Sequence, residues 1–178
     1  MKIPSKRTIG LAIAAILLAE IATRAGMKAT GLHLNYTASL PVGLYREAPK
    51  GEAQYAGICL PASVITGALH AGLETLPGDC PGGVAPILKP VVEASEAHPI
   101  IYSESGFYID GSLVPNTAPK THAHTGNSLQ HYPFGVYKSG LWAISEFNAN
   151  SFDSRYFGPL PDGAVRFYVK PVLTEEEK

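Results

Sequence analysis

The residue with the clearest chemical potential is a lysine inside an apolar segment. Lys89 lies among Ile87, Leu88 and Val91, in a short run that is typical of a buried strand. Burial in apolar surroundings lowers the pKa of a lysine amine. A fall from about 10.4 to roughly 7 or 8 would allow the amine to act as a general base near neutral pH. The alternative is a strand lysine whose amine points outward to water.

Ser39 has the surroundings of a possible nucleophile. It lies between Thr37 and Pro41, in a hydroxyl-bearing segment that favours a turn over the interior of a strand. From a turn, a serine hydroxyl can project into a cleft while a backbone N–H faces the developing oxyanion of an acyl transfer. An ordinary turn serine is the alternative reading. Together, Ser39 and Lys89 suggest a serine hydrolase with a lysine base.

A third polar segment, at residues 151–158, contains Asp153 and Arg155 between the aromatic residues Phe152 and Tyr156. Opposite charges two residues apart, with apolar neighbours, favour a buried ion pair that holds a turn. We therefore interpret Asp153 and Arg155 as supporting residues.

The segments 35–45, 86–91 and 151–158 resemble, in this order, the signal peptidase I family of Ser-Lys endopeptidases. The string S-x-D-S-R-Y-x-G in the last segment matches the C-terminal box of that family residue by residue. The first segment reads S-L-P where ordinary signal peptidases carry S-M-x-P, Pro90 follows Lys89 in place of arginine, and the Gly-Asp-Asn run before the last box is missing. These departures, with S-L-P-x-G-L-Y and C-P-G-G-x-x-P-x-L-K-P, resemble the TraF branch, which is encoded with conjugative transfer systems.

The resemblance covers about residues 35 to 172 and implies the chemical roles of three residues. Ser39 would be the nucleophile and Lys89 the general base. Thr37 would donate a side-chain hydrogen bond to the oxyanion, beside the backbone N–H of Ser39. Such a mechanism uses no cofactor and no metal ion.

The resemblance also implies supporting roles in the last segment. Ser151 would orient Lys89, and Asp153 would form a salt bridge with Arg155 that holds the framework of the site. In the TraF branch the aspartate has also been assigned catalytic importance, so Asp153 stays a catalytic candidate.

For the TraF branch, the resemblance implies maturation of a conjugative pilin precursor. The peptidase would remove a C-terminal stretch through an acyl-enzyme on Ser39 and join the new end to the N-terminus. An amine held close to the ester can outcompete water, which makes this head-to-tail cyclisation chemically reasonable. The implied fold is mainly β, with coiled antiparallel sheets, one or two short helices and a membrane-facing cleft that takes an extended peptide by strand addition.

Four other readings stay open. A general signal peptidase would act on many exported proteins, and a non-enzymatic part of a conjugative secretion complex would keep the fold alone. A transition metal would need His122, His124 and His131 with Asp110. A Ser-His-Asp triad would lack the usual G-x-S-x-G elbow.

The N-terminus predicts a signal sequence or membrane anchor at residues 1–25. An apolar run from Ile9 to Ala19 is interrupted by Glu20, and three basic residues precede it: Lys2, Lys6 and Arg7. The basic residues favour a cytoplasmic N-terminus. This orientation would leave a peptidase domain at residues 30–174 on the periplasmic side of the inner membrane, where other conjugative transfer proteins are possible partners. The alternative is a buried core helix, and cleavage of the segment is left open.

The composition fits one globular domain with an appendage. The chain has 178 residues, of which 46% are hydrophobic and 16% charged, and this rules out disorder of the whole chain. The formal net charge of -1 gives no global attraction to phosphate backbones. Nucleic acid is therefore not expected as a main partner.

Short apolar segments between glycines and prolines predict a β-rich body. The expected strands are 55–60, 87–92, 107–109, 141–144 and 165–172. Asp110-Gly111 predicts a two-residue hairpin, because both positions tolerate positive φ. Residues 61–72 have helical spacing, and residues 115–133 are expected to form a long loop.

Cys59 and Cys80 are the only two cysteines. An exported body would lie in an oxidising compartment, where a disulfide between them can persist. Two unpaired thiols are the alternative.

Overall fold

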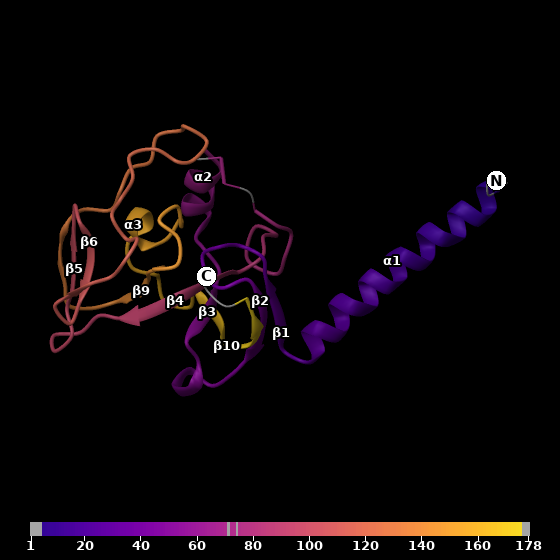
Figure 1. Cartoon of the computed structure of the whole chain (residues 1–178), viewed down its shortest axis with the longest axis horizontal. Coiled ribbons are helices and arrows are strands. Elements are labelled where there is room, and N and C mark those ends of the chain that lie inside the picture. Colours follow the sequence, from indigo (N-terminus) through magenta and orange to yellow (C-terminus); the bar gives the residue numbers. More distant parts are fainter. Residues whose placement is uncertain (1–4, 71, 74, 176–178) are drawn as a thin grey trace.

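An N-terminal helix, α1 (Lys6–Ala29), projects away from a β-rich body (Figure 1). The computed structural model describes residues 5–70, 72–73 and 75–175, so Lys2 lies outside the described residues. At 1.5 Å per residue, the helix is about 36 Å long, which exceeds the ~30 Å hydrocarbon core of a bilayer. Apolar side chains such as Ile16 and Leu18 are exposed. The alternative of a buried core helix is therefore wrong, and α1 has the length and hydropathy of a membrane anchor or signal sequence.

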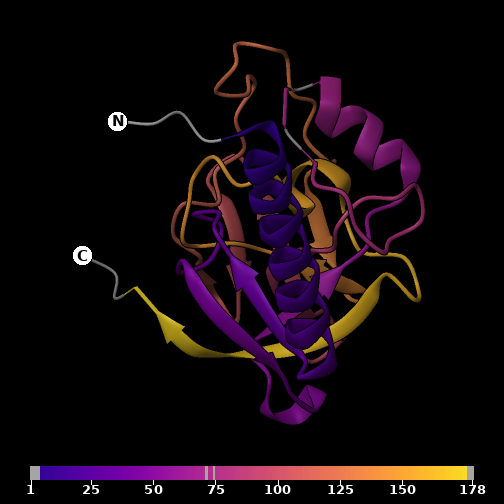
Figure 2. The ribbon, with the colours of Figure 1, turned by 90° about the vertical axis from the view of Figure 1, so that its right-hand side faces the viewer.

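The larger of the two sheets in the described residues combines four strands from the N-terminal half of the body with two strands from later in the chain. All of its neighbouring strands are antiparallel, and Figure 2 shows the last of them in sequence, β10, as a long curved strand. In spatial order the six strands are β1 (Leu32–Asn35), β2 (Gly43–Glu47), β10 (Val165–Thr174), β3 (Tyr55–Ile58), β4 (Ile87–Glu93) and β9 (Leu141–Ala143).

The smaller sheet is built from the middle of the chain. In spatial order its four strands are β7 (Ser112–Leu113), β6 (Gly106–Ile109), β5 (Ile100–Ser103) and β8 (Gly135–Tyr137). The predicted hairpin joins β6 to β7, with φ of 50° at Asp110 and 78° at Gly111. Both residues thus have the left-handed backbone that a two-residue turn of this kind requires.

Within the described part of the chain, three short helical segments complete the body: η1 (Lys50–Glu52), α2 (Ala62–His70) and α3 (Ser154–Phe157). The predicted helix after Pro61 corresponds to α2. Each of the five strand segments expected from the sequence contains a strand, and the fold class of mainly antiparallel β-structure is confirmed. The strands β1, β2, β5 and β8 were not predicted. In the segment 115–133, expected to be a loop, the structure has no helix and no strand.

The two sheets meet at an apolar core to which β9 contributes on both faces. Trp142 packs with Tyr102 and Phe107 of the smaller sheet. The next residue, Ala143, packs with Ala56 and Ile58 of β3. Because successive side chains of a strand point to opposite faces, one short strand joins the two packing layers.

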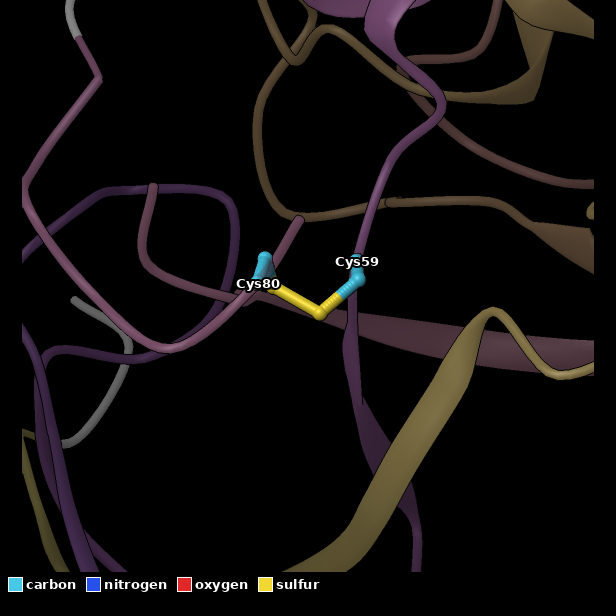
Figure 3. The surroundings of a disulfide bond; sticks show 2 residues. All are labelled: Cys59 and Cys80. Atoms are coloured by element: carbon cyan, nitrogen blue, oxygen red, sulfur yellow. A yellow bond between two sulfur atoms is a disulfide. The ribbon is translucent and has the colours of Figure 1, made fainter. Parts of the chain in front are cut away.

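Cys59 and Cys80 form a disulfide, as predicted (Figure 3). Their Cα atoms are 5.4 Å apart, and 21 residues separate them in sequence. The bond ties the end of β3 to the segment that leads into β4. The alternative of two free thiols is wrong.

Candidate functional site

β4 places Lys89 in the interior of the larger sheet. Lys89 lies opposite Ala56 of β3, and only 4% of its surface is exposed. Its amine donates a hydrogen bond of 2.7 Å to the hydroxyl of Ser151. The alternative of an outward-pointing lysine is therefore wrong.

Burial lowers the pKa of the Lys89 amine to about 8. The main cause is the loss of water around the ammonium group, which disfavours its charged form. The negative charge of Asp153 opposes this change and the positive charge of Arg155 adds to it. A substantial fraction of the amine is therefore neutral, and able to accept a proton, at mildly alkaline pH.

Ser39 lies in the turn between β1 and β2, and the amide of Asn35 organises that turn. The Asn35 side chain donates to the carbonyl of Thr37 at 2.8 Å and to that of Leu40 at 3.2 Å. Leu40 is 1% exposed and anchors the turn in the core beside Tyr45. These contacts leave the Ser39 hydroxyl 3.5 Å from the Ser151 hydroxyl.

The Ser151 hydroxyl thus lies between the lysine amine and the candidate nucleophile. It accepts from Lys89 and is in hydrogen-bond reach of Ser39. Amine and serine hydroxyl are brought together from segments 50 residues apart in sequence. The arrangement can carry a proton from Ser39 to Lys89 when the amine is neutral.

Thr37 lies on the cleft side of the same turn. Its hydroxyl donates to the Asn35 side chain at 3.0 Å. A rotation of this hydroxyl would be needed before it could donate to a substrate.

Asp153 and Arg155 form a buried ion pair with two contacts. The carboxylate accepts from Arg155 Nε at 2.8 Å and from a terminal guanidinium nitrogen at 2.9 Å, and both side chains are fully buried. Arg155 also donates to the carbonyls of Asn116, Ala149 and Ser151. The interpretation of an ion pair that holds a turn is confirmed, since one guanidinium ties together residues 149–155 and joins them to the segment of Asn116.

The local sequence explains why this turn forms. Asp153 is the N-cap of α3 and accepts from the Arg155 backbone N–H at 3.1 Å. Gly158 ends the helix with φ of 74° and packs against the Tyr132 ring, which a side chain at this position would strike. The D-S-R-Y-x-G part of the motif is thus a capped single turn of helix.

Two functional positions escaped the sequence reading. Asn35 shapes the turn that carries Ser39, and Ser145 donates to the Ser39 carbonyl at 2.6 Å. An asparagine that opens a turn is a recognisable signal. Ser145 gives no such signal, because its partner is 106 residues away.

A cleft of about 530 Å³ opens over these residues. Ser39, Lys89 and Ser151 line it together with Thr37. Most of the other walls are apolar and come from β3, α2 and the segment that precedes Lys89, including Leu60, Ile65, Leu76 and Leu88. The cleft therefore suits an uncharged, extended segment of chain.

The suggested metal ligands do not converge. Asp110 bonds to His98 at 2.8 Å, and His131 stacks on Phe134. Within the part of the chain that the structure describes, no cluster of three or more His, Cys, Asp or Glu side chains could hold a metal ion. A Ser-His-Asp triad would need a histidine bonded to the serine hydroxyl. His124 lines the cleft, but the hydrogen-bond partner described for the Ser39 hydroxyl is Ser151.

Comparison with known proteins identifies the family. The plasmid transfer protein TraF of Escherichia coli is 33% identical over 168 residues, which cover 91% of this chain and 90% of that relative. The chain belongs to the TraF family. A conjugal transfer protein TraF of Agrobacterium tumefaciens is 30% identical over 148 residues, covering 81% of this chain and 83% of the relative. A probable conjugal transfer protein TraF of Sinorhizobium fredii is 28% identical over 174 residues, covering 92% and 88%.

Membership of the TraF family supports a role in conjugative transfer. No family model matches the chain. No solved structure matches it either.

Proposed function

We propose that this TraF-family protein is a membrane-anchored endopeptidase of the signal peptidase I type, with Ser39 as nucleophile and Lys89 as general base. The observation that carries the proposal is a buried lysine amine, with lowered pKa, linked through one hydroxyl to a turn serine in an apolar cleft. A strongly perturbed titratable group in a cleft marks a candidate catalytic site.

The proton path follows from the three side chains. With Lys89 protonated, hydrogen bonds run from the amine to Ser151 and from Ser151 to Ser39. When the amine is neutral, both hydroxyls can rotate so that Ser39 donates to Ser151 and Ser151 donates to Lys89. The Ser39 proton can then reach the amine through Ser151, or directly after a small movement of the turn.

The covalent chemistry is an acyl transfer. Ser39 Oγ attacks the scissile carbonyl, the bond to the leaving amine breaks, and protonated Lys89 returns its proton to that amine. Water or a second amine then attacks the Ser39 ester and releases the serine. With the N-terminal amine of the substrate as attacking group, the product is a cyclic peptide.

The oxyanion would be stabilised from the turn that carries Ser39. The Ser39 backbone N–H and the Thr37 hydroxyl are the proposed donors, the latter after rotation away from Asn35. Asp153 acts mainly through Arg155, which donates to the Ser151 carbonyl at 2.7 Å.

The proposed substrate is the pilin precursor of the conjugative system that encodes this chain. Names of the relatives connect the family with plasmid and conjugal transfer, and an apolar cleft suits an extended peptide. Lys6 and Arg7 before the apolar part of α1 favour a cytoplasmic N-terminus. The disulfide supports a periplasmic body, because cytoplasmic thiols are normally kept reduced.

Co-expression with the pilin precursor, followed by mass spectrometry, tests the proposal. Wild-type protein should remove a C-terminal stretch, and a cyclic product would be 18 Da lighter than the linear mature pilin. Ser39→Ala should leave the precursor intact, whereas Ser105→Ala, an exposed serine in the turn between β5 and β6, should process normally. Mature pilin at wild-type levels with Ser39→Ala would refute the proposal.

A further inference from the structure

Ser145 connects the buried ion pair to the backbone of Ser39. Its hydroxyl donates to the Ser39 carbonyl at 2.6 Å, and its backbone N–H donates to Asp153 Oδ2 at 3.2 Å. The side chain is 0% exposed. Water therefore cannot replace the hydroxyl as a partner of the Ser39 carbonyl without local rearrangement.

The position of Ser145 is fixed by the sheet. It lies two residues after the end of β9, and the residue between them, Ile144, donates its backbone N–H to the Pro90 carbonyl at 3.1 Å. Pro90 is the neighbour of Lys89 in β4. The Ser39 carbonyl is thus hydrogen-bonded to residues 144–145, and these residues are hydrogen-bonded to β4, the strand that carries Lys89.

The ion pair is linked to the backbone of both serines of the relay, Ser39 and Ser151. On one side, Arg155 donates to the Ser151 carbonyl at 2.7 Å. On the other side, Asp153 holds Ser145, and Ser145 holds Ser39. The two arms together fix the separation of the Ser39 and Ser151 hydroxyls.

We propose that Ser145 is a positioning residue that holds Ser39 in register with Ser151 and Lys89. This inference rests on the proposed peptidase function. Without the Ser145 hydroxyl, the turn that carries Ser39 would keep its hydrogen bonds to the Asn35 side chain. It would lose the hydrogen bond that connects the Ser39 carbonyl to the segment beside β4. The nucleophile would then sample misaligned positions, and misplacement by about 1 Å can cost up to 10²-fold in rate.

A positioning role differs from a purely structural role in its kinetic signature. Because Ser145 hydrogen-bonds to Ser39, Ser145→Ala should lower kcat about ten- to a hundred-fold. KM should stay within about twofold. The desolvation that lowers the Lys89 pKa comes from the surrounding protein, and the described hydrogen bonds of Ser145 go to Ser39 and Asp153, so the apparent pKa of the pH–rate profile should not move.

Ser154 offers a matched control. It is also a fully buried serine, and its hydroxyl accepts a hydrogen bond of 2.8 Å from the Ala143 backbone N–H. Ser154→Ala loses one buried hydrogen bond near the same strand without touching Ser39. It should lower the melting temperature by an amount similar to Ser145→Ala while kcat stays near that of wild type.

The assay uses the full-length protein and a peptide that spans the cleavage site mapped by mass spectrometry. Wild-type kcat in Ser145→Ala, or a loss matched by Ser154→Ala, would overturn the inference while leaving the peptidase proposal intact. An inactive wild-type protein would instead refute the peptidase proposal. If Ser145→Ala does not fold, Ser145→Cys has nearly the same volume and a weaker donor. A kcat for Ser145→Cys equal to wild type would overturn the inference, and a fall in kcat at constant KM would support it.

Discussion

The surroundings of Lys89 and the core beneath the smaller sheet are both buried, yet they differ in their side chains. Beside Lys89 and its apolar neighbour Ala56 lies a cluster of buried polar and charged residues: Ser145, Ser151, Asp153 and Arg155. Beneath the smaller sheet, Tyr102 stacks on Phe107 with ring centroids 4.3 Å apart, and Trp142 packs edge-on against Phe107.

The two regions touch at the Arg155 carbonyl, which accepts from the Tyr102 hydroxyl at 3.0 Å and from the Tyr132 backbone N–H at 2.7 Å. Burial of the aromatic rings favours folding, since it removes apolar surface from water. Burial of charged groups opposes folding unless each is paired, and even then the gain is small. The concentration of buried charge beside the cleft is therefore not explained by stability, and it supports the proposed catalytic role.

The largest expected effect separates activity from stability at Lys89. Lys89→Met should lower processing on the order of 10⁴-fold or more, because no group remains to accept the Ser39 proton. Its melting temperature should equal or exceed that of wild type, since a buried amine is replaced by an apolar chain of similar length. Lys89→Arg should also be inactive, because a guanidinium stays protonated.

Double substitution tests whether the two residues act as one unit. Ser39→Ala combined with Lys89→Met should be no less active than either single variant, because each already prevents activation of the nucleophile. Precursor processing measured by mass spectrometry, beside thermal unfolding, gives both quantities. Additive losses would argue that Ser39 and Lys89 act independently.

The aromatic core should respond in the opposite way. Trp142→Ala should destabilise the body by about 3–5 kcal/mol, because it leaves a large cavity between the sheets. Denaturant unfolding measures this loss. At a temperature where the variant is still folded, its kcat should lie far closer to wild type than that of Lys89→Met, and an equal loss of kcat would remove the contrast between the regions.

Breaking the ion pair between Asp153 and Arg155 should lower both stability and activity. Asp153→Ala leaves Arg155 buried without its counter-charge, which costs about 3–5 kcal/mol. Adding Arg155→Met removes the uncompensated charge and should recover part of the stability but none of the activity, because Ser151 and Ser145 stay unanchored. Recovery of processing in the double variant would show that the ion pair does not position the site.

The sequence predicted those features whose causes are local. The apolar flanks of Lys89 indicated its burial, Asp110-Gly111 indicated the hairpin, and the spacing of Asp153 and Arg155 indicated the ion pair. Strands β1 and β2 were not predicted, because each is only four or five residues long and β2 takes its second partner from β10, far away in sequence. The role of Ser151 came from a resemblance to a known family.

Ser145 illustrates a different limit of prediction from the sequence. A serine in an ordinary sequence context has no pattern of its own, and its function depends on a contact across 106 residues. Such contacts depend on the packing of β9 beside β4. The residues proposed to react could therefore be selected from the sequence, whereas part of the framework that would align them could not.

Removal of the disulfide should have an intermediate effect on stability. Cys59→Ala with Cys80→Ala opens a loop with a sequence separation of 21 residues, and its closure contributes about 3 kcal/mol in the chain-entropy model. Thr75, Leu76 and Val84 lie within the loop and line the cleft. KM should therefore rise more than kcat falls, and denaturant unfolding with peptide kinetics would detect both changes.

The dependence of activity on pH tests the state of the Lys89 amine without any substitution. Burial sets the pKa of Lys89 at about 8, and only the neutral amine can accept the Ser39 proton. One pH unit below that value roughly a tenth of the amine is neutral, so kcat/KM should rise about tenfold per unit below pH 8 and level off above it. A kcat/KM profile that stays flat from pH 6 to pH 9 would exclude Lys89 as the base.

The same pKa predicts a stability effect with a definite sign. In the unfolded chain the amine titrates near its ordinary value of 10.5, whereas in the folded protein it titrates at about 8. Between these values the unfolded state binds the extra proton, so the free energy of unfolding should rise with pH, by roughly 3 kcal/mol in all. Lys89→Met removes the titrating group, and the difference between wild type and this variant isolates the lysine from nearby tyrosines that also titrate at alkaline pH. If that difference does not change between pH 8 and pH 10, the folded-state pKa of Lys89 is not lowered, and the contrast between a chemically poised region and an inert core loses its main support.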